Sequence, residues 1–217
     1  MRQFAVIGLS SFGYYLCRNL TERGHQVMAV DMSTAKIESV QEFVQRAVVA
    51  DAADRETLSR IGVADSDVVI VCLGDQIDAS VLTTLYLKEL GAKEIWVKAM
   101  TEDHGKVLHL IGASNVIFPE KDMAERVAYS LSSDNVLEHI PLAAGYSIIE
   151  LAPPSAFVGK TLGELDLPKK YGVMVLVIKE LIPENVVSMP SGTYRIKDSD
   201  ILVVTGQDTD LKKLQGL

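Results

Sequence analysis

The chain opens on a glycine-containing turn between two short patterned segments, and this turn limits the possible folds more than any other feature. Residues 3–7 (QFAVI) have the composition of a buried strand, and residues 14–23 repeat apolar side chains at the period of a helix. The turn between them reads Gly8-Leu9-Ser10-Ser11-Phe12-Gly13, and a second apolar segment, residues 26–30, ends in Asp31. This order of strand, turn, helix, strand and acid is typical of units that hold a pyrophosphate at a helix N-terminus.

The turn departs from the usual G-x-G-x-x-G pattern at its middle position. Gly8 and Gly13 keep the glycines that permit the tight turn and the close packing of helix on strand. Ser10 replaces the glycine at which the backbone approaches the phosphates, so its Cβ reduces the clearance there. Asp31 favours a free ribose 2′-hydroxyl, as in NAD or an adenine nucleotide. Two interpretations follow: a working nucleotide site, or a Rossmann-like shell whose site has decayed.

Composition excludes several classes of function. The net charge of −8 argues against nucleic acid as the main partner, because binding to a phosphate backbone needs clustered lysine and arginine. No apolar run approaches the ~18–20 residues of a membrane span, and the first residues do not have the pattern of a signal peptide. Cys17 and Cys72 belong to predicted buried segments and form no C-x-x-C pair, which is consistent with a reducing cytoplasm.

Strand and helix patterns alternate through the first two thirds of the chain. Repeated β-α units require right-handed crossovers and predict a Rossmann-like α/β fold with a doubly wound parallel sheet in the order 3-2-1-4-5-6. Ligands bind such sheets at the carboxyl ends of the strands, so Gly8, Asp31, Asp51 and Gly74 should share one crevice. The remaining strands are predicted at residues 47–50, 67–73, 94–98 and 115–118, and the helices at 34–43, 54–61, 78–90 and 102–111.

A long helix, predicted at residues 120–132, ends the alternating region and is followed by no further strand of that sheet. We therefore predict a nucleotide-binding domain at residues 1–135, including this helix, and a small α+β domain at residues 136–217. Such a small domain is near the lower limit for a stable core, so contacts between copies are expected. Its strands are predicted at residues 136–141, 146–151, 173–179, 186–188 and 201–205, with helices at 161–165, where Thr161 and Glu164 have capping-box spacing, and at 208–214.

The sequence contains no recognisable catalytic or metal-binding constellation. His104 and His109 are five residues apart, not four, and are interpreted as surface helix residues; neither they nor His25 and His139 have metal-ligand spacing. There is no G-x-S-x-G or Walker motif, and the second domain supplies no obvious acid, base or hydride-site lining. We therefore expect a protein that is not an enzyme.

Long stretches of both halves resemble one family: the RCK (KTN) proteins, which join TrkA-N and TrkA-C domains and are the cytosolic gating subunits of Ktr and Trk potassium transporters. The Ktr-type subunit is the nearest match, and the resemblance covers nearly the whole chain. The stretches that carry it are FAVIGLSSFG at 4–13, HQVMAVD at 25–31, ASVLTTLYLKELG at 79–91, IWVKA at 95–99, VLHLIGASNVIFPEKDMAERVA at 107–128 and DLPKKYGVMVLVIK at 166–179.

The resemblance implies a regulatory subunit that lies in the cytoplasm at the inner face of the membrane. Such subunits form homodimers through the first domain and assemble into an octameric ring under a potassium channel subunit of Ktr or Trk type. ADP or ATP binds in the crevice and changes the shape of the ring, which gates the channel. Two alternatives from other classes are an NAD-dependent oxidoreductase and a structural adaptor whose nucleotide site is silent.

The resemblance also assigns site residues. Glu120 corresponds to a carboxylate that helps hold a divalent cation, Mg²⁺ or Ca²⁺, near the phosphates at the dimer interface. The residues implied to bind the nucleotide are Gly8, Ser10, Ser11, Phe12 and Gly13 in the turn, Asp31, Met32 and Lys36 after the second strand, Asp51 and Ala52 at the adenine edge, Gly74 and Gln76 after the fourth strand, and Lys98 at the end of the fifth.

Two departures from the family pattern bear on ligand choice. Family members usually read GLGRFG at the turn, so Ser11 replaces an arginine expected to meet the terminal phosphate. We expect weaker discrimination of ATP from ADP, or a preference for AMP or NAD. Some relatives bind cyclic di-AMP in the second domain, but the arginine expected after a strand at 166–167 is Pro168 here, followed by Lys169 and Lys170. The alternative is a plain dimerisation module that uses residues 173–178.

Overall fold

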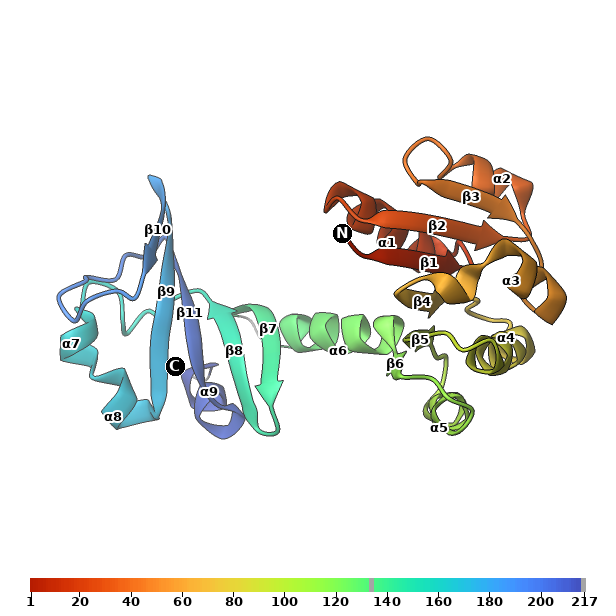
Figure 1. Cartoon of the computed structure of the whole chain (residues 1–217). Coiled ribbons are helices and arrows are strands. Elements are labelled where there is room, and N and C mark those ends of the chain that lie inside the picture. Colours follow the sequence, from red (N-terminus) through yellow and green to blue (C-terminus); the bar gives the residue numbers. More distant parts are fainter. Residues whose placement is uncertain (133–134, 216–217) are drawn as a thin grey trace. The chain divides into compact units, whose positions relative to one another are not determined.

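The computed structural model describes residues 1–132 and 135–215. The chain divides into two compact units, Met1–Pro119 and Glu120–Leu217. Each unit has its own sheet, which Figure 1 shows in red to green for the first and in green to blue for the second. Within the described residues, every helix is too short or too polar to cross a bilayer.

The first unit is built on a parallel sheet of six strands in the order β3-β2-β1-β4-β5-β6. The predicted doubly wound fold and strand order are therefore confirmed. β4 is buried along its whole length, as its continuous apolar sequence requires in a sheet covered on both faces. The strands are β1 (Gln3–Ile7), β2 (Gln26–Asp31), β3 (Arg46–Val49), β4 (Val68–Val71), β5 (Ile95–Lys98) and β6 (Asn115–Ile117).

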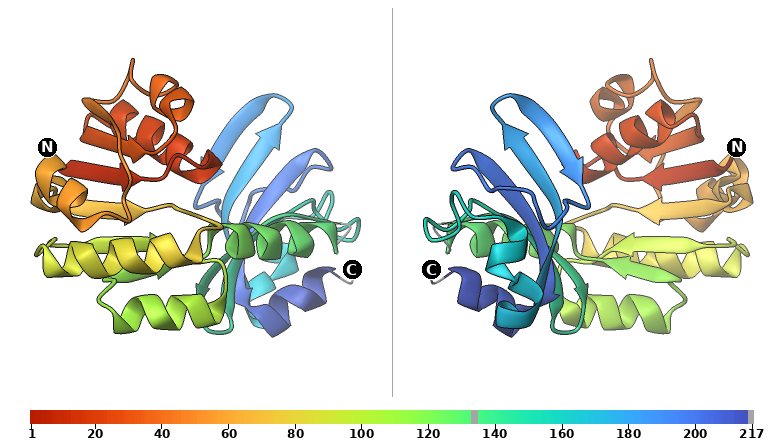
Figure 2. Two further views of the ribbon diagram at one scale, coloured as in Figure 1. Left: turned by 90° about the vertical axis from the view of Figure 1, so that its right-hand side faces the viewer. Right: turned by 90° about the vertical axis from the view of Figure 1, so that its left-hand side faces the viewer.

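Helices cover both faces of this sheet, and each face has its own apolar cluster (Figure 2). One cluster lies under α1 (Ser11–Glu22) and α2 (Thr34–Glu38) and contains both cysteines, which are buried as predicted. The other cluster includes Leu58, Leu87 and Leu108, one from each of three helices. These helices are α3 (Arg55–Ile61), α4 (Ile77–Glu89) and α5 (Glu102–Leu110), and a short 3-10 turn, η1 (Val63–Asp65), follows α3.

The second unit is built on an antiparallel sheet of five strands in the order β10-β9-β11-β8-β7. The capping box between Thr161 and Glu164 is present at the start of α7, as the sequence predicted. The elements are α6 (Pro119–Leu131), β7 (Val136–Ala143), β8 (Tyr146–Leu151), α7 (Leu162–Leu165), α8 (Leu167–Tyr171), β9 (Val173–Leu181), β10 (Glu184–Ser188), β11 (Asp200–Gln207) and α9 (Asp208–Gln215).

A buried polar cluster joins β9 to the loop before β11. Glu180 and Asp200 are register partners, and the Tyr194 hydroxyl lies 3.0 Å from a carboxylate oxygen of each. Lys197 pairs with Glu180, and the Asn185 amide donates to the same carboxylate at 2.7 Å. Hydrogen bonds from the side chains of Lys197, Asn185 and Tyr194 lower the pKa of Glu180 to about 2. The carboxylate therefore stays ionised and fixes this loop.

Two predictions of secondary structure were wrong. The helix expected at residues 34–43 ends at Glu38. The Ser39 hydroxyl donates to the Lys36 carbonyl at 2.6 Å, and three-residue turn bonds, from the Val40 N–H to Ile37 and from the Phe43 N–H to Val40, interrupt the helical pattern after it. The strand expected at residues 166–167 is also absent. Asp166 instead adopts a left-handed conformation between α7 and α8, and Pro168 lies in the first turn of α8, where its missing N–H has no cost.

The division between the units falls near α6. The first compact unit ends at Pro119, so α6 groups with the second unit by its internal contacts. The domain boundary near residue 135 stays a prediction, since residues 133–134 lie outside the described residues. No residue of α6 is buried, and an apolar stripe of Met123 (52%), Val127 (48%) and Leu131 (83%) is exposed on it.

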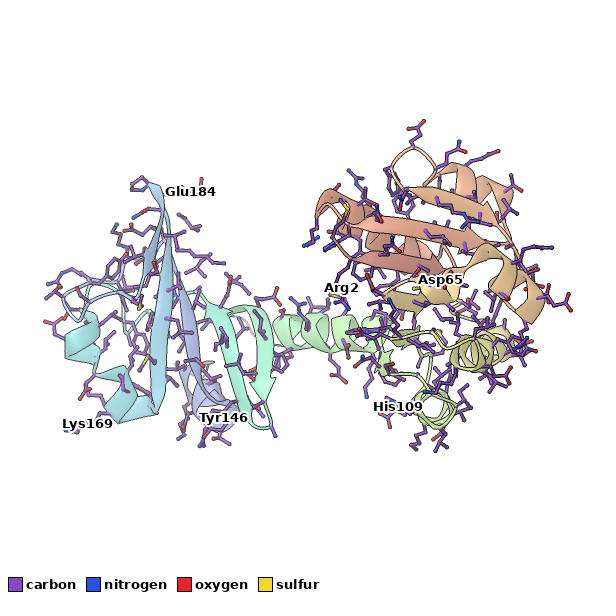
Figure 3. All side chains as sticks on the ribbon, in the orientation of Figure 1. Arg2, Asp65, His109, Tyr146, Lys169 and Glu184 are labelled. Atoms are coloured by element: carbon purple, nitrogen blue, oxygen red, sulfur yellow. The ribbon has the colours of Figure 1, made fainter. Side chains whose placement is uncertain are left out.

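His104 differs from its predicted position on the surface. It is only 5% exposed, and its Nδ1 accepts the Met100 N–H at 3.3 Å. His109, five residues along α5, is exposed as predicted (Figure 3). Burial lowers the pKa of the His104 imidazole, because the charged form loses its hydration.

Replacing His104 should make the first unit less sensitive to acid. The folded chain binds the imidazole proton more weakly than the unfolded chain, so stability falls as the pH drops below the ordinary histidine pKa of about 6.5. In His104→Asn that fall should shrink, because a neutral amide can accept the same N–H. Urea unfolding, followed by Trp96 fluorescence at about pH 7.5 and about pH 5.5, measures the difference. His109→Asn is the control, and an equal acid response in His104→Asn and wild type would contradict the role of burial.

Candidate functional site

The turn between β1 and α1 requires its two glycines. Gly8 has φ +92°, and a Cβ there would lie 2.8 Å from the Cys72 carbonyl carbon and oxygen. A Cβ at Gly13 would lie 2.1 Å from the Gly8 carbonyl oxygen. The first glycine therefore lets the turn approach β4, and the last lets α1 begin directly on β1. These are the structural roles that the sequence predicted for both positions.

Ser10 caps α1 within this turn. Its backbone is extended, with φ −64° and ψ 173°, and its Oγ accepts the Gly13 N–H at 3.5 Å. The same hydroxyl lies 3.4 Å from the Cys72 carbonyl oxygen and donates to it. The hydroxyl thus satisfies one of the helix N–H groups that a phosphate could otherwise contact. Ser11 is exposed, and Phe12 packs against the cluster on the α1 face.

Asp31, at the end of β2, is bonded to the turn. Its Oδ2 accepts the Leu9 N–H at 2.6 Å, and its Oδ1 accepts the Ser33 N–H at 2.8 Å. Lys36 Nζ lies 3.5 Å from Oδ2, with its side chain about half exposed, while the Asp31 side chain is only 10% exposed. A carboxylate has about four acceptor positions, so these three contacts leave capacity for one ribose hydroxyl. Met32, beside it, is 62% exposed.

Asp51 and Ala52, which follow β3, are fixed by a turn and by a contact with α4. Asp51 Oδ1 accepts the Ala53 N–H at 2.8 Å, which closes an Asx turn. Ala52 is buried, and its carbonyl accepts the Thr83 hydroxyl of α4 at 2.9 Å. Thr83 was not among the predicted site residues, because a threonine within an apolar helix pattern gives no signal of such a contact.

The remaining predicted residues follow β4, β5 and β6. Gly74 has φ +57° and is buried, whereas Gln76 is exposed just before α4. Lys98, at the end of β5, is only 5% exposed. Because all six strands are parallel, these positions share the carboxyl edge of the sheet with the Gly8 turn and Asp31. Hydrogen bonds and an ion pair join the turn, Asp31 and Lys36, and the other predicted residues follow strands at the same edge.

Glu120 lies near the start of α6, in the second unit. Among residues 1–132 and 135–215, no three His, Cys, Asp or Glu side chains are grouped so that they could hold a metal ion. The metal role of Glu120 therefore stays a prediction.

The fold and this edge define a class: proteins with a Rossmann-like nucleotide-binding unit followed by a small α+β unit. Comparison with known families then narrows the class. The TrkA-N domain family matches residues 4–119, and the TrkA-C domain family matches residues 146–217. The chain belongs to the family that joins these two domains, and the resemblance to RCK proteins is confirmed.

Full-length relatives place the chain near the Ktr proteins. Ktr system potassium uptake protein C of Bacillus subtilis (strain 168) is 41% identical over 214 residues, which cover 99% of this chain and 96% of that protein. Ktr system potassium uptake protein A of Vibrio alginolyticus is 39% identical over 217 residues, which cover 100% and 98%.

Solved structures support the fold. The GsuK RCK domain has a TM-score of 0.69 at 22% identity and covers 100% of this chain and 47% of that chain. The GsuK channel bound to NAD has a TM-score of 0.70 at 19% identity and covers 100% and 40%.

Gly13→Ala should destabilise the first unit by about 1–3 kcal/mol, because its Cβ would overlap the Gly8 carbonyl oxygen. Gly192→Ala is the matched control, since a Cβ there meets only ordinary contacts, 3.8 Å away or more. Urea unfolding followed by circular dichroism gives both free energies. Equal values for the two variants would show that the turn can relax and that close approach does not require glycine.

Proposed function

We propose that this chain is the nucleotide-binding regulatory subunit of a potassium uptake system of Ktr type. The observation that carries the proposal is a preformed site at the carboxyl edge of the first sheet, made of the Gly8 turn, Asp31 and Lys36 and called the nucleotide edge below. It occurs in a chain that aligns over nearly its whole length with Ktr proteins. Regulation, rather than catalysis, agrees with the family and with a site whose polar groups are committed to holding the turn. The chain would act at the cytosolic face of a membrane potassium channel subunit.

The ligand we propose is an adenine nucleotide with a free 2′-hydroxyl: ADP, ATP or NAD. Asp31 supports this choice, because its carboxylate can accept one hydroxyl and would repel a 2′-phosphate. Lys36 lies beside it with an exposed ammonium that could meet a phosphate. One neighbour of the same fold is a channel bound to NAD. Binding at the carboxyl edge would involve the residues after β1 to β5 predicted above.

Assembly of several copies is part of the proposal. The exposed stripe of α6 and an apolar groove of about 230 Å³ on the sheet face beside α1 support contacts between copies. The groove is lined mainly by aromatic and aliphatic side chains, including Phe12, Leu16 and Trp96. We propose a dimer that assembles further into an octameric ring, with Glu120 helping to hold Mg²⁺ or Ca²⁺. We also propose cyclic di-AMP as a ligand of the second unit, although Pro168 stands where the family resemblance leads us to expect an arginine.

Potassium uptake tests the function directly. Cells that lack their own potassium uptake and express a Ktr membrane subunit should take up potassium faster when this chain is added. Asp31→Asn should reduce that gain, because it weakens the hydrogen bond to the Leu9 N–H and the contact with the ribose. Mass spectrometry of nucleotide carried through purification would identify the natural ligand. Uptake unchanged by the chain in cells that contain both subunits would reject the proposal.

Ser11→Arg should restore preference for ATP over ADP. A charge-assisted contact is worth about 1.5–3 kcal/mol, so the ATP to ADP affinity ratio should rise about tenfold or more. Calorimetric titration with ATP, ADP and NAD measures it. Ser11→Met is the control, because it adds length at the same exposed position without charge. Wild-type protein that already binds ATP tightly and ADP much more weakly would contradict the role given to Ser11.

Val127→Asp should weaken assembly, because it places a charge within the exposed stripe of α6. We expect wild-type protein to elute as a dimer or larger and the variant to shift toward monomer in light scattering after gel filtration. Glu125→Ala, on the same helix, should leave the assembly unchanged. A monomeric wild type would overturn the proposed assembly.

A further inference from the structure

The second unit contains a cavity that the nucleotide site does not use. Its volume is about 470 Å³, within the range of roughly 300–1,000 Å³ typical of small-molecule sites. The cavity lies between α7, α8 and the segment that precedes α7. Every lining residue belongs to the second unit, so the cavity is independent of the first.

The charge of this cavity is opposite to that of the chain. Lys160, Lys170 and Arg195 line it together with a single carboxylate, Glu164, although the whole chain has a net charge of −8. The local excess of two positive charges favours an anion.

The cationic groups are positioned rather than randomly exposed. The backbone of Arg195 forms a β-bridge with Thr161, and its guanidinium donates to the Gly159 carbonyl, which holds the side chain beside the wall. Lys170 Nζ donates to the Glu164 carbonyl at 3.3 Å. These bonds use one donor of each group, whereas a guanidinium has five N–H donors and an ammonium three. The remaining donors can bind oxygens of a ligand.

The one carboxylate that lines the cavity, Glu164, is held in the capping box of α7. Glu164 Oε2 accepts the Thr161 backbone N–H at 2.7 Å in the capping box. Its pKa is lowered, first by the Thr161 backbone and side chain and also by Arg195 and Lys160. The group therefore stays ionised, and its commitment to the cap limits its repulsion of a bound anion.

The rest of the lining is apolar and partly aromatic. Phe157 and Leu165 are buried at 2% and 5% exposure, and Tyr171 is half-buried beside Phe157, with ring centroids 6.0 Å apart. Such a wall suits a flat apolar group rather than a hydrated inorganic ion.

We propose that this cavity binds a small phosphate monoester that carries a flat apolar group. The phosphate would meet Lys160, Lys170 and the fork of Arg195, which suits a dianion. The flat group would lie against Tyr171, whose ring packs on the buried Phe157. The site is separate from the nucleotide edge, and the proposal does not depend on the function proposed above.

Phenyl phosphate is the probe, titrated calorimetrically into the full chain at low and high salt. Binding should be detected at low salt and weaken as salt screens the cations. Lys160→Gln and Lys170→Gln should each weaken it about tenfold or more. Lys169→Gln, which does not line the cavity and whose residue Figure 3 labels on α8, should leave binding unchanged. Glu164→Gln should strengthen binding.

Several outcomes would overturn the proposal. Absence of binding, or equal weakening by Lys169→Gln, would place the interaction elsewhere or reduce it to general attraction. Phenol or inorganic phosphate binding as tightly as phenyl phosphate would refute the need for both parts of the ligand. Benzoate binding as tightly as phenyl phosphate would contradict the proposed preference for a phosphate over a carboxylate. Circular dichroism melting of each variant checks that a loss of binding is not a loss of fold.

Discussion

The bond between the Asp31 carboxylate and the Leu9 N–H fixes the geometry of the nucleotide edge. At 2.6 Å it is a short, charge-assisted hydrogen bond between the end of β2 and the turn after β1. The Gly8 N–H adds a second link, donating to the Val30 carbonyl at 2.7 Å. Together these bonds hold the turn in place before any ligand arrives. The cost of ordering the turn is therefore met during folding, which leaves more of the binding free energy for affinity.

Ser10 has a different consequence from the one its sequence position first indicated. A side chain at the middle glycine was expected to reduce clearance for phosphates. The backbone there is extended, a conformation open to any residue, and the hydroxyl is directed to the Gly13 N–H and the Cys72 carbonyl. The substitution therefore keeps the turn intact and changes which donors remain for a ligand. A phosphate at this turn would have to compete with the hydroxyl for the Gly13 N–H.

Much of the fold could be predicted from sequence because the signals were periodic and local. The apolar run that became β4 and the alternation of strands and helices were enough for the order β3-β2-β1-β4-β5-β6. The errors arose where one side chain decided the outcome. Ser39 ended a helix by bonding to the Lys36 carbonyl, and His104 turned inward although its spacing indicated a surface position. Neither contact leaves a pattern in sequence, because each depends on packing that forms only in the folded chain.

The site was predictable only in part for the same reason. Gly8, Gly13 and Asp31 were identified because their roles follow from backbone geometry, and the structure bonds the turn to Asp31 as that geometry requires. Thr83 and the inward direction of the Ser10 hydroxyl depend on neighbours distant in sequence. The cavity beside α7 and α8 was even harder to predict from sequence. Its cationic residues, Lys160, Lys170 and Arg195, are far apart along the chain and come together only in the folded unit.

A regulatory chain with two ligand sites is subject to reciprocity. If a ligand on the second unit changes the affinity of the nucleotide edge, a nucleotide must change the affinity of the second unit by the same factor. Coupling of this kind needs an element with two arrangements that both ligands bias. None of the residues of α6 is buried, and its stripe of Met123, Val127 and Leu131 is exposed, so the packing of this helix is not fixed by either core. The cores of the two units, by contrast, are closely packed and separately stabilised. Close packing resists continuous deformation, so neither core by itself supplies the two arrangements that coupling requires.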